Sequence, residues 1–399
     1  MNLYSKPIEK SIAYYSLIVL TCMNFFGQGA LFCLILGLFC IIKYPEIEMS
    51  FNMLAITLFV FCIILTTLLF DKSFNEIPKS FNYLLIYMAG KNGFCNAKDK
   101  VKFIKNTMFF IFLGFLTQLF LHYLYNRGKT IEEGRRLLYS FWTKQYVSVT
   151  LIGLLSAVII GYAYYGIFVC KNKPIKILCI LSLVLTAVVN FSTATRTPFL
   201  LTAIIFSLMS LIYFTKAKSV KKIRILATVI LLAVIAFIFY NADVFGIKSY
   251  IMTTPLFARI EKTGVETSRT LIFQEYFKYM TQYPFGGNHI AEIVGKEAHN
   301  YLQQSYDRYG ICAFISIIFI TAHFIKNIVL LLRRKTDADC VILIASVFFS
   351  MFIQCCLEPI FDGYPIEFWF LLMIDGMMSG INTYRNSLTV SENLLNENC

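Results

Sequence analysis

The chain has 399 residues, of which 58% are hydrophobic and only 15% are charged, and its mean hydropathy is +0.66. A water-facing surface needs more charge than this, so the composition excludes a soluble globular protein and predicts a polytopic membrane protein. The net charge of +13 is spread over short clusters beside apolar segments. This pattern argues against nucleic acid as a partner and favours anionic lipid headgroups.

Twelve apolar segments predict membrane-spanning helices, because a helix needs about 20 mostly apolar residues to cross the hydrocarbon core. One long polar interruption, residues 242–309, separates the ninth segment from the tenth. The expected fold class is all-α, a polytopic transmembrane helical bundle of about 12 spans with a long extracytoplasmic helical loop. The expected spans are 11–24, 27–42, 52–70, 80–90, 104–122, 147–169, 175–194, 197–214, 223–241, 310–332, 340–357 and 365–381.

Lys and Arg near the span ends predict the orientation, because positive charge in short loops is retained in the cytoplasm. With the N-terminus inside, twenty basic residues of the short connections lie on the cytoplasmic side and eight on the other. Both termini are therefore expected in the cytoplasm, with the long loop outside. The expected division is a membrane bundle at 1–241, the extracytoplasmic loop at 242–309, the rest of the bundle at 310–381 and a cytoplasmic tail at 382–399.

Arg196 stands between two expected spans, 175–194 and 197–214, at the outer membrane face of this topology. Charges at such places are costly and often functional. A guanidinium offers a planar fork of donors that can bind phosphate oxygens and neutralise their charge. The alternative is an interfacial anchor whose side chain extends to lipid headgroups, and the residue type alone does not decide between the two.

Within the loop, Ser268 is the expected N-cap of a helix over 269–282, where apolar and aromatic residues recur at three- and four-residue steps. Pro284 and the two glycines that follow Phe285 are expected to end this helix. Arg269 would open the helix, so its charge and the first helix amides would face the same anion. The alternative is an ordinary solvated arginine.

A second short helix is expected to start near Lys296 or Glu297 and to end at Gly310. It would contain His299, the residue best able to exchange a proton near neutral pH. The alternative is a structural histidine. A zinc site is not expected, because no second His at helical spacing and no Cys stands nearby. On a helix, His299 would share one face with Leu302, Gln303 and Tyr306.

Asp307 and Glu275 are the best placed acids, although either could pair with a basic neighbour on a helix surface. Asp375 lies inside the last expected span, where one acid without a relay partner does not make a proton pathway. Tyr276 and Tyr306 could stack on sugar rings or belong to the aromatic belt of the interface. No obvious pair is expected among the outward acids, which are Asp243, Glu261, Glu266, Glu275, Glu292, Glu297, Asp307, Glu358 and Asp362.

Taken in order, these motifs resemble the O-antigen polymerase and O-antigen ligase superfamily of bacterial membrane enzymes. The motif portion covers residues 190–315, and the spans and the long loop extend the similarity to the whole chain. Two positions depart from the family pattern. Asp307 lies one residue further from its glycine than the usual Glu-x-Gly, and Phe273 replaces a common Trp. The matching residues are Thr195, Arg196, Thr197 and Pro198, then Arg269, then Pro284, Phe285, Gly286 and Gly287, then His299, Asn300 and Leu302, then Asp307 and Gly310.

The resemblance implies transfer of a glycan from an undecaprenyl diphosphate donor to a sugar hydroxyl at the outer face of the bacterial plasma (inner) membrane. Arg196 and Arg269 would stabilise the departing diphosphate, and His299 would be the catalytic base. No metal or other cofactor is implied. The implied partners are the lipid-linked glycan donor and acceptor, membrane lipid and a candidate chain-length regulator. The expected substrate-binding residues are Asn300, Gln303, Tyr276, Tyr306 and Asp307.

Polymerisation of repeat units into O-antigen or capsular polysaccharide is the preferred function. One alternative is an O-antigen ligase that transfers glycan to lipid A core or protein. Another is a lipid-linked oligosaccharide flippase, for which internal repeats and charges near the membrane midplane are expected. A noncatalytic scaffold is a third alternative, and it predicts that changes at the three candidate catalytic residues leave glycan length unaltered.

Overall fold

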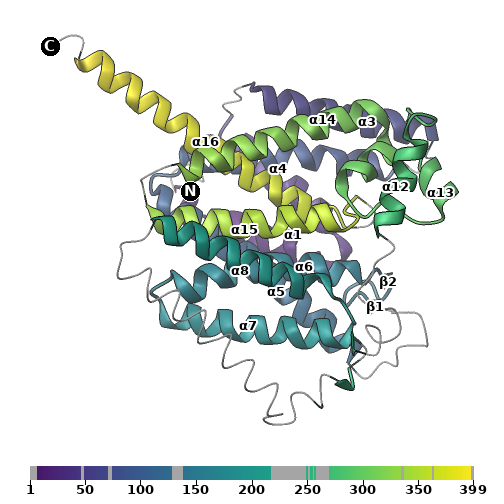
Figure 1. The fold of residues 1–399 in the computed structure, drawn as a ribbon. Coiled ribbons are helices and arrows are strands. Elements are labelled where there is room, and N and C mark those ends of the chain that lie inside the picture. Colours follow the sequence, from purple (N-terminus) through teal and green to yellow (C-terminus); the bar gives the residue numbers. More distant parts are fainter. Residues whose placement is uncertain are drawn as a thin grey trace. The chain divides into compact units, whose positions relative to one another are not determined.

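The computed structural model describes residues 7–45, 49–70, 74–127, 138–216, 249, 252–254, 256–257, 269–333, 337–361 and 364–396. In these ranges the chain forms thirteen α-helices and a single two-stranded hairpin (Figure 1). The hairpin joins β1 (Leu138–Tyr139) to β2 (Tyr146–Val147). The helices are α1 (Ile12–Cys22), α2 (Gly29–Lys43), α3 (Phe51–Phe70), α4 (Glu76–Asn96), α5 (Lys100–Asn126), α6 (Thr150–Phe168), α7 (Lys173–Ser192), α8 (Thr197–Lys216), α12 (Arg269–Met280), α13 (His289–Val294), α14 (Tyr301–Leu332), α15 (Ala338–Leu357) and α16 (Ile366–Asn396).

The predicted all-α fold is confirmed for the described residues. Each expected span coincides with a helix except 223–241, which lies outside the described residues. Among the described residues, seven helices are long and apolar enough to cross a membrane, as expected for a multi-pass membrane protein: α3, α5, α6, α7, α8, α14 and α15. The α4 helix is longer than predicted, 21 residues, and the polar residues Lys91 and Asn92 beyond its predicted end are buried. The count of twelve spans stays a prediction.

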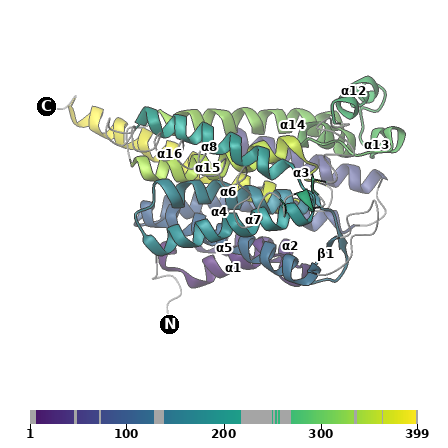
Figure 2. The ribbon, with the colours of Figure 1, turned by 60° about the horizontal axis from the view of Figure 1, so that its bottom comes forward.

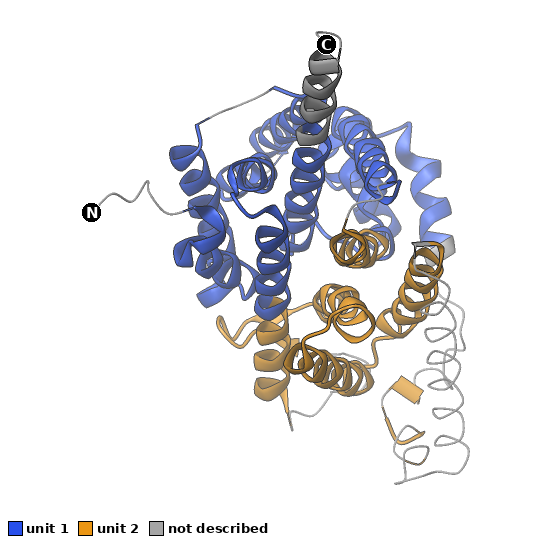
Figure 3. Cartoon of the chain, turned by 90° about the vertical axis from the view of Figure 1, so that its left-hand side faces the viewer, with its two compact units in different colours: residues 1–114, 269–336, 355–399 blue, residues 115–268, 337–354 orange. Residues whose placement is uncertain are grey.

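The chain divides into two compact units (Figure 3). Unit 1 comprises residues 1–114, 269–336 and 355–399, and unit 2 comprises residues 115–268 and 337–354. The chain passes between the units within α5, before α12, before α15 and within α15. The predicted division of the chain at residues 241, 309 and 381 stays a prediction.

Two glycines allow α4 and α16 of unit 1 to pack closely. A Cβ atom at Gly90 would lie 2.0 Å from the Met373 carbonyl oxygen, and one at Gly376 would lie 2.2 Å from that of Tyr87. Small residues at such positions let two backbones approach within a membrane, where dispersion contacts replace the hydrophobic effect as the source of helix association.

In unit 2, α6 packs against both α7 and α8 (Figure 2). Most of its residues are buried, which explains why the segment is apolar on every face. The Ser350 hydroxyl of α15 donates to the Ala157 carbonyl of α6 at 2.6 Å. A polar side chain is therefore satisfied inside an apolar interface.

The described end of the long loop lies in unit 1 and contains α12, α13 and the first part of α14. The predicted helix from Arg269 is present, and it ends before Gly286 and Gly287, whose φ angles are +83° and +94°. The short helix α13 was not predicted. The next helix begins at Tyr301 rather than near residue 296, because Asn300 is its N-cap and accepts the Gln303 amide. Residues 242–248, 250–251, 255 and 258–268 of the loop, among them the predicted N-cap Ser268, lie outside the described residues.

Candidate functional site

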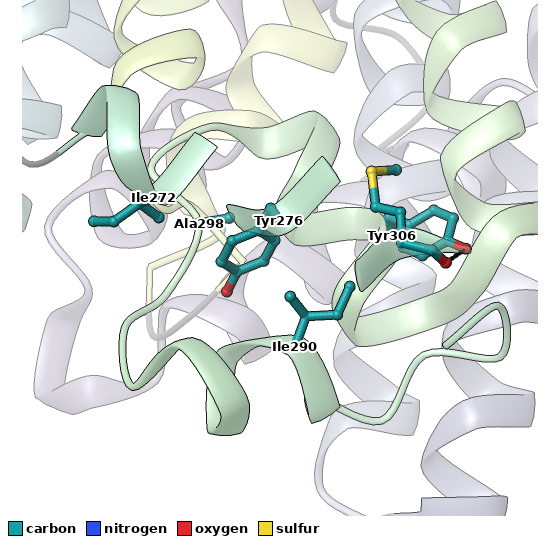
Figure 4. Close-up of a cluster of buried hydrophobic side chains, with 6 residues drawn as sticks. Ile272, Tyr276, Ile290, Ala298 and Tyr306 are labelled. Carbon is teal, nitrogen blue, oxygen red and sulfur yellow. Dashed lines mark hydrogen bonds between the residues drawn. The ribbon is translucent and has the colours of Figure 1, made fainter. Parts of the chain in front are cut away.

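The loop is held together by a small apolar core, which we call the loop core. Figure 4 shows its side chains, contributed by α12, α13, the connection before α14, and α14 itself. Tyr276 is fully buried there and donates hydrogen bonds to the Lys296 carbonyl at 3.1 Å and to Asp307 Oδ2 at 3.3 Å. Burial, reinforced by the nearby Asp307 charge, raises the pKa of Tyr276, so its hydroxyl remains a donor. The loop core consists of Ile272, Tyr276, Met280, Ile290, Ala298 and Tyr306.

Asp307 joins α14 to the start of α13. Its two carboxylate oxygens accept the backbone amides of Ile290 at 2.9 Å and Ala291 at 3.1 Å. These amides belong to the first turn of α13 and have no partner within that helix. Asp307 therefore supplies, from a distant part of the chain, the capping interaction that a six-residue helix needs.

Gln303 and Asn300 connect α14 to α12. Asn300 Nδ2 donates to Gln303 Oε1 at 2.7 Å, and Gln303 Nε2 donates to the Phe273 carbonyl at 2.9 Å. The Tyr306 hydroxyl donates to the Met280 carbonyl.

Four of the five expected substrate-binding residues, Gln303, Tyr276, Tyr306 and Asp307, are thus engaged in internal contacts, and all four are at most 4% exposed. In the described structure these four side chains stabilise the loop and are not exposed to a substrate. Asn300 is half-buried, and its contact with a substrate stays a prediction.

His299 lies immediately before the Asn300 cap and is paired with an acid from another part of unit 1. Its Nδ1 is 3.7 Å from Glu358 Oε2. The His299 side chain is 30% exposed, whereas that of Glu358 is 4% exposed. The two atoms lie within ion-pair distance and make no hydrogen bond to each other, so a buried carboxylate faces the imidazole of a candidate general base.

A second buried acid, Glu367, lies close to Glu358. Glu367 is fully buried in the first turn of α16, and neither of its carboxyl oxygens has a hydrogen-bond partner among the described residues. An electrostatic interaction links it to Glu358. A charged carboxylate without a donor is costly to bury, so we expect Glu367 to be a neutral acid. Glu367 was not among the predicted site residues, although an acid inside an apolar segment by itself indicates a candidate functional residue.

Gln304 holds the segment that carries Glu358 against α14. Its Oε1 accepts the amides of Ile360 and Phe361, both at 2.8 Å, and its Nε2 donates to Glu297 Oε2 at 3.3 Å. Gln304 is 2% exposed. No spacing in the sequence could have identified this role, because its partners lie 56 and 57 residues away.

The two candidate arginines lie in different units. Arg196 occupies the four-residue connection between α7 and α8 in unit 2, where Thr195 donates its amide to the Asn190 carbonyl at 3.0 Å. Arg269 begins α12 in unit 1, as predicted, and its side chain lies outside the described part of the chain. The convergence of both with His299 therefore stays a prediction.

Within the described ranges, no group of three or more His, Cys, Asp or Glu side chains could hold a metal ion. Comparison with models of known protein families and with curated proteins finds no match to this chain.

Proposed function

We propose that this chain is a membrane-embedded glycosyltransferase that polymerises undecaprenyl-diphosphate-linked oligosaccharide repeat units at the outer face of a bacterial plasma membrane. The observation that carries the proposal is the pairing of His299 with the buried Glu358. It places a buried carboxylate at ion-pair distance from the histidine of the His-Asn-x-Leu sequence at residues 299–302, where it can stabilise a general base that has taken up a proton. The substrate class is proposed because the order of the motifs in residues 190–315 resembles that of the O-antigen polymerase and ligase superfamily.

In the proposed reaction, a hydroxyl of the acceptor sugar attacks the anomeric carbon of the donor glycan. The bond from that carbon to the diphosphate oxygen breaks, and its electron pair leaves with the diphosphate. His299 takes the hydroxyl proton, and Glu358 stabilises the resulting imidazolium. Arg196 and Arg269 stabilise the charge that grows on the diphosphate, which is more negative in the transition state than in the donor.

Two other functions predict that different glycan intermediates accumulate when the gene is deleted. A ligase would transfer finished polymer to lipid A core or protein. A flippase is supported by one observation, a buried Asp and His pair between the long helices of unit 1, because transporters place ionisable groups near the membrane midplane.

Deletion of the gene, followed by gel analysis of surface glycan and lipid-linked intermediates, separates these functions. Loss of a polymerase leaves single repeat units on lipid at the outer face, whereas loss of a ligase leaves unattached polymer. Loss of a flippase leaves single units on the cytoplasmic face. Rescue by the intact gene but not by His299→Ala would connect the polymerase phenotype to the proposed base.

A further inference from the structure

A buried polar cluster lies among the long helices of unit 1, away from His299. Asp375 of α16 is fully buried, and its Oδ2 is 3.0 Å from His323 Nδ1 of α14. Asn327 Nδ2 of α14 donates to Asp375 Oδ1 at 2.7 Å, and Asn52 Nδ2 of α3 donates to Oδ2 at 2.9 Å. Two helices, α3 and α14, thus direct polar side chains at one carboxylate on α16.

A further side-chain amide of α16, that of Asn382, extends the cluster. Asn382 Nδ2 donates to Asn327 Oδ1 at 3.0 Å, and Asn327 Nδ2 lies 3.1 Å from His323 Nδ1. The expectation that Asp375 lacks a relay partner is wrong, because His323 lies beside it. The partners Asn52, His323 and Asn327 are 323, 52 and 48 residues away, so no local pattern could have revealed them.

Helix association alone does not require this charge. Neutral side chains can form interhelical hydrogen bonds in a membrane, and asparagine at position 375 could supply them. An aspartate near the middle of a span is costly to insert. The imidazole at 3.0 Å offsets that cost only if the two groups hold a proton between them, which makes the pair neutral overall.

We propose that Asp375 and His323 form a proton-binding site within the membrane-spanning part of unit 1. Asp375 is fully buried, whereas the His323 side chain keeps 16% of its surface exposed. On the other helices packed around Asp375, α4 contributes the buried ionisable residues Tyr87 and Lys91, and α3 contributes the amide of Asn52. The inference does not depend on the proposed glycosyltransferase function.

Infrared spectroscopy of the intact protein reconstituted in lipid tests this site directly. A protonated carboxyl group has a C=O stretch distinct from that of a carboxylate, so spectra recorded between about pH 5 and 8 report its protonation. We expect a titrating carboxyl band that Asp375→Asn abolishes. The matched control is Glu367→Gln, which removes the other buried acid of α16 and should leave that band in place.

A second variant makes the test independent of the folding of Asp375→Asn. His323→Gln removes the imidazole that shares the proton and should shift the midpoint of the band by roughly one pH unit or more. A band that is insensitive to His323→Gln would overturn the proposal. So would a wild-type spectrum from which folded Asp375→Asn removes no titrating carboxyl band, and the cluster would then be a fixed interhelical contact.

Discussion

The hydroxyl of Tyr301 lies 2.8 Å from that of Thr321, although both residues belong to α14 and are twenty positions apart. In a straight helix they would be separated by about 30 Å. The two parts of α14 therefore fold against each other at Gly310, where φ is +82° and ψ is −177°. The fold-back buries Tyr301 and holds the adjacent His299 end of the segment beside the apolar part of α14.

Gly310→Ala should destabilise the protein, by about 1 to 3 kcal/mol. Alanine at this position would have to keep a positive φ, which is unfavourable for a residue with a Cβ atom. That Cβ would also lie 2.8 Å from the Pro284 carbonyl oxygen. Gly295→Ala is the matched control, because Gly295 has a φ of +68° but a Cβ added there would meet nothing within 4 Å. Thermal unfolding of both purified variants in detergent checks the difference, and an equal loss at the two positions would contradict the packing described for Gly310.

Gln304→Leu should lower both stability and glycan transfer. Two buried amides, those of Ile360 and Phe361, would lose their acceptor, at a cost of about 1 to 3 kcal/mol each, and Glu358 would lose its fixed position. Gln282→Leu is the control, since Gln282 is exposed. Thermal unfolding and the length of lipid-linked glycan are the measurements. Unchanged values in both would show that the Gln304 contacts do not position Glu358.

The helices of this protein were largely predictable, because an apolar run of about twenty residues can cross a membrane only as a helix that satisfies its own backbone hydrogen bonds. The arrangement of the site was not. The α13 helix depends on Asp307, which lies 17 residues after Ile290, so local propensity alone does not favour it. The pair of His299 and Glu358 depends on folding that brings together two segments 59 positions apart in the sequence.

Tyr276→Phe should cost about 1 to 3 kcal/mol, because Asp307 and the Lys296 carbonyl lose a buried donor while the ring stays in place. Tyr279→Phe, on the same helix but only partly buried, is the control and should cost less. Chemical or thermal unfolding at neutral pH measures both. A smaller effect at Tyr276 than at Tyr279 would contradict the central place of Tyr276 in the loop core.

The wild-type protein should lose stability in alkaline solution through the same residue. Burial raises the pKa of Tyr276 above that of the unfolded chain, so its contribution is complete below a pH of about 10 and declines as the pH rises further. Tyr276→Phe should remove this part of the alkaline decline. Unfolding curves of the two proteins at increasing pH provide the comparison, and parallel declines would argue against a buried hydroxyl at this position.

Arg196→Lys and Arg269→Lys should each abolish long-chain glycan, as the Ala variants at these positions should, provided that the variants insert into the membrane. A diphosphate bound by a bidentate fork requires the planar guanidinium, which an ammonium cannot reproduce. Gel analysis of surface glycan in a deletion strain tests both positions. Normal ladders with Lys would show that simple electrostatic attraction is sufficient there.

The most direct measurement of the central claim is elongation by the purified protein in liposomes, with lipid-linked repeat units isolated from the deletion strain as the only glycan. The wild-type protein should join these units into longer chains without added nucleotide sugar. His299→Ala, if folded, should be slower by about 100-fold or more, and Glu358→Gln should fall between the two. Elongation by His299→Ala at the wild-type rate, or no elongation by the wild-type protein, would contradict the account.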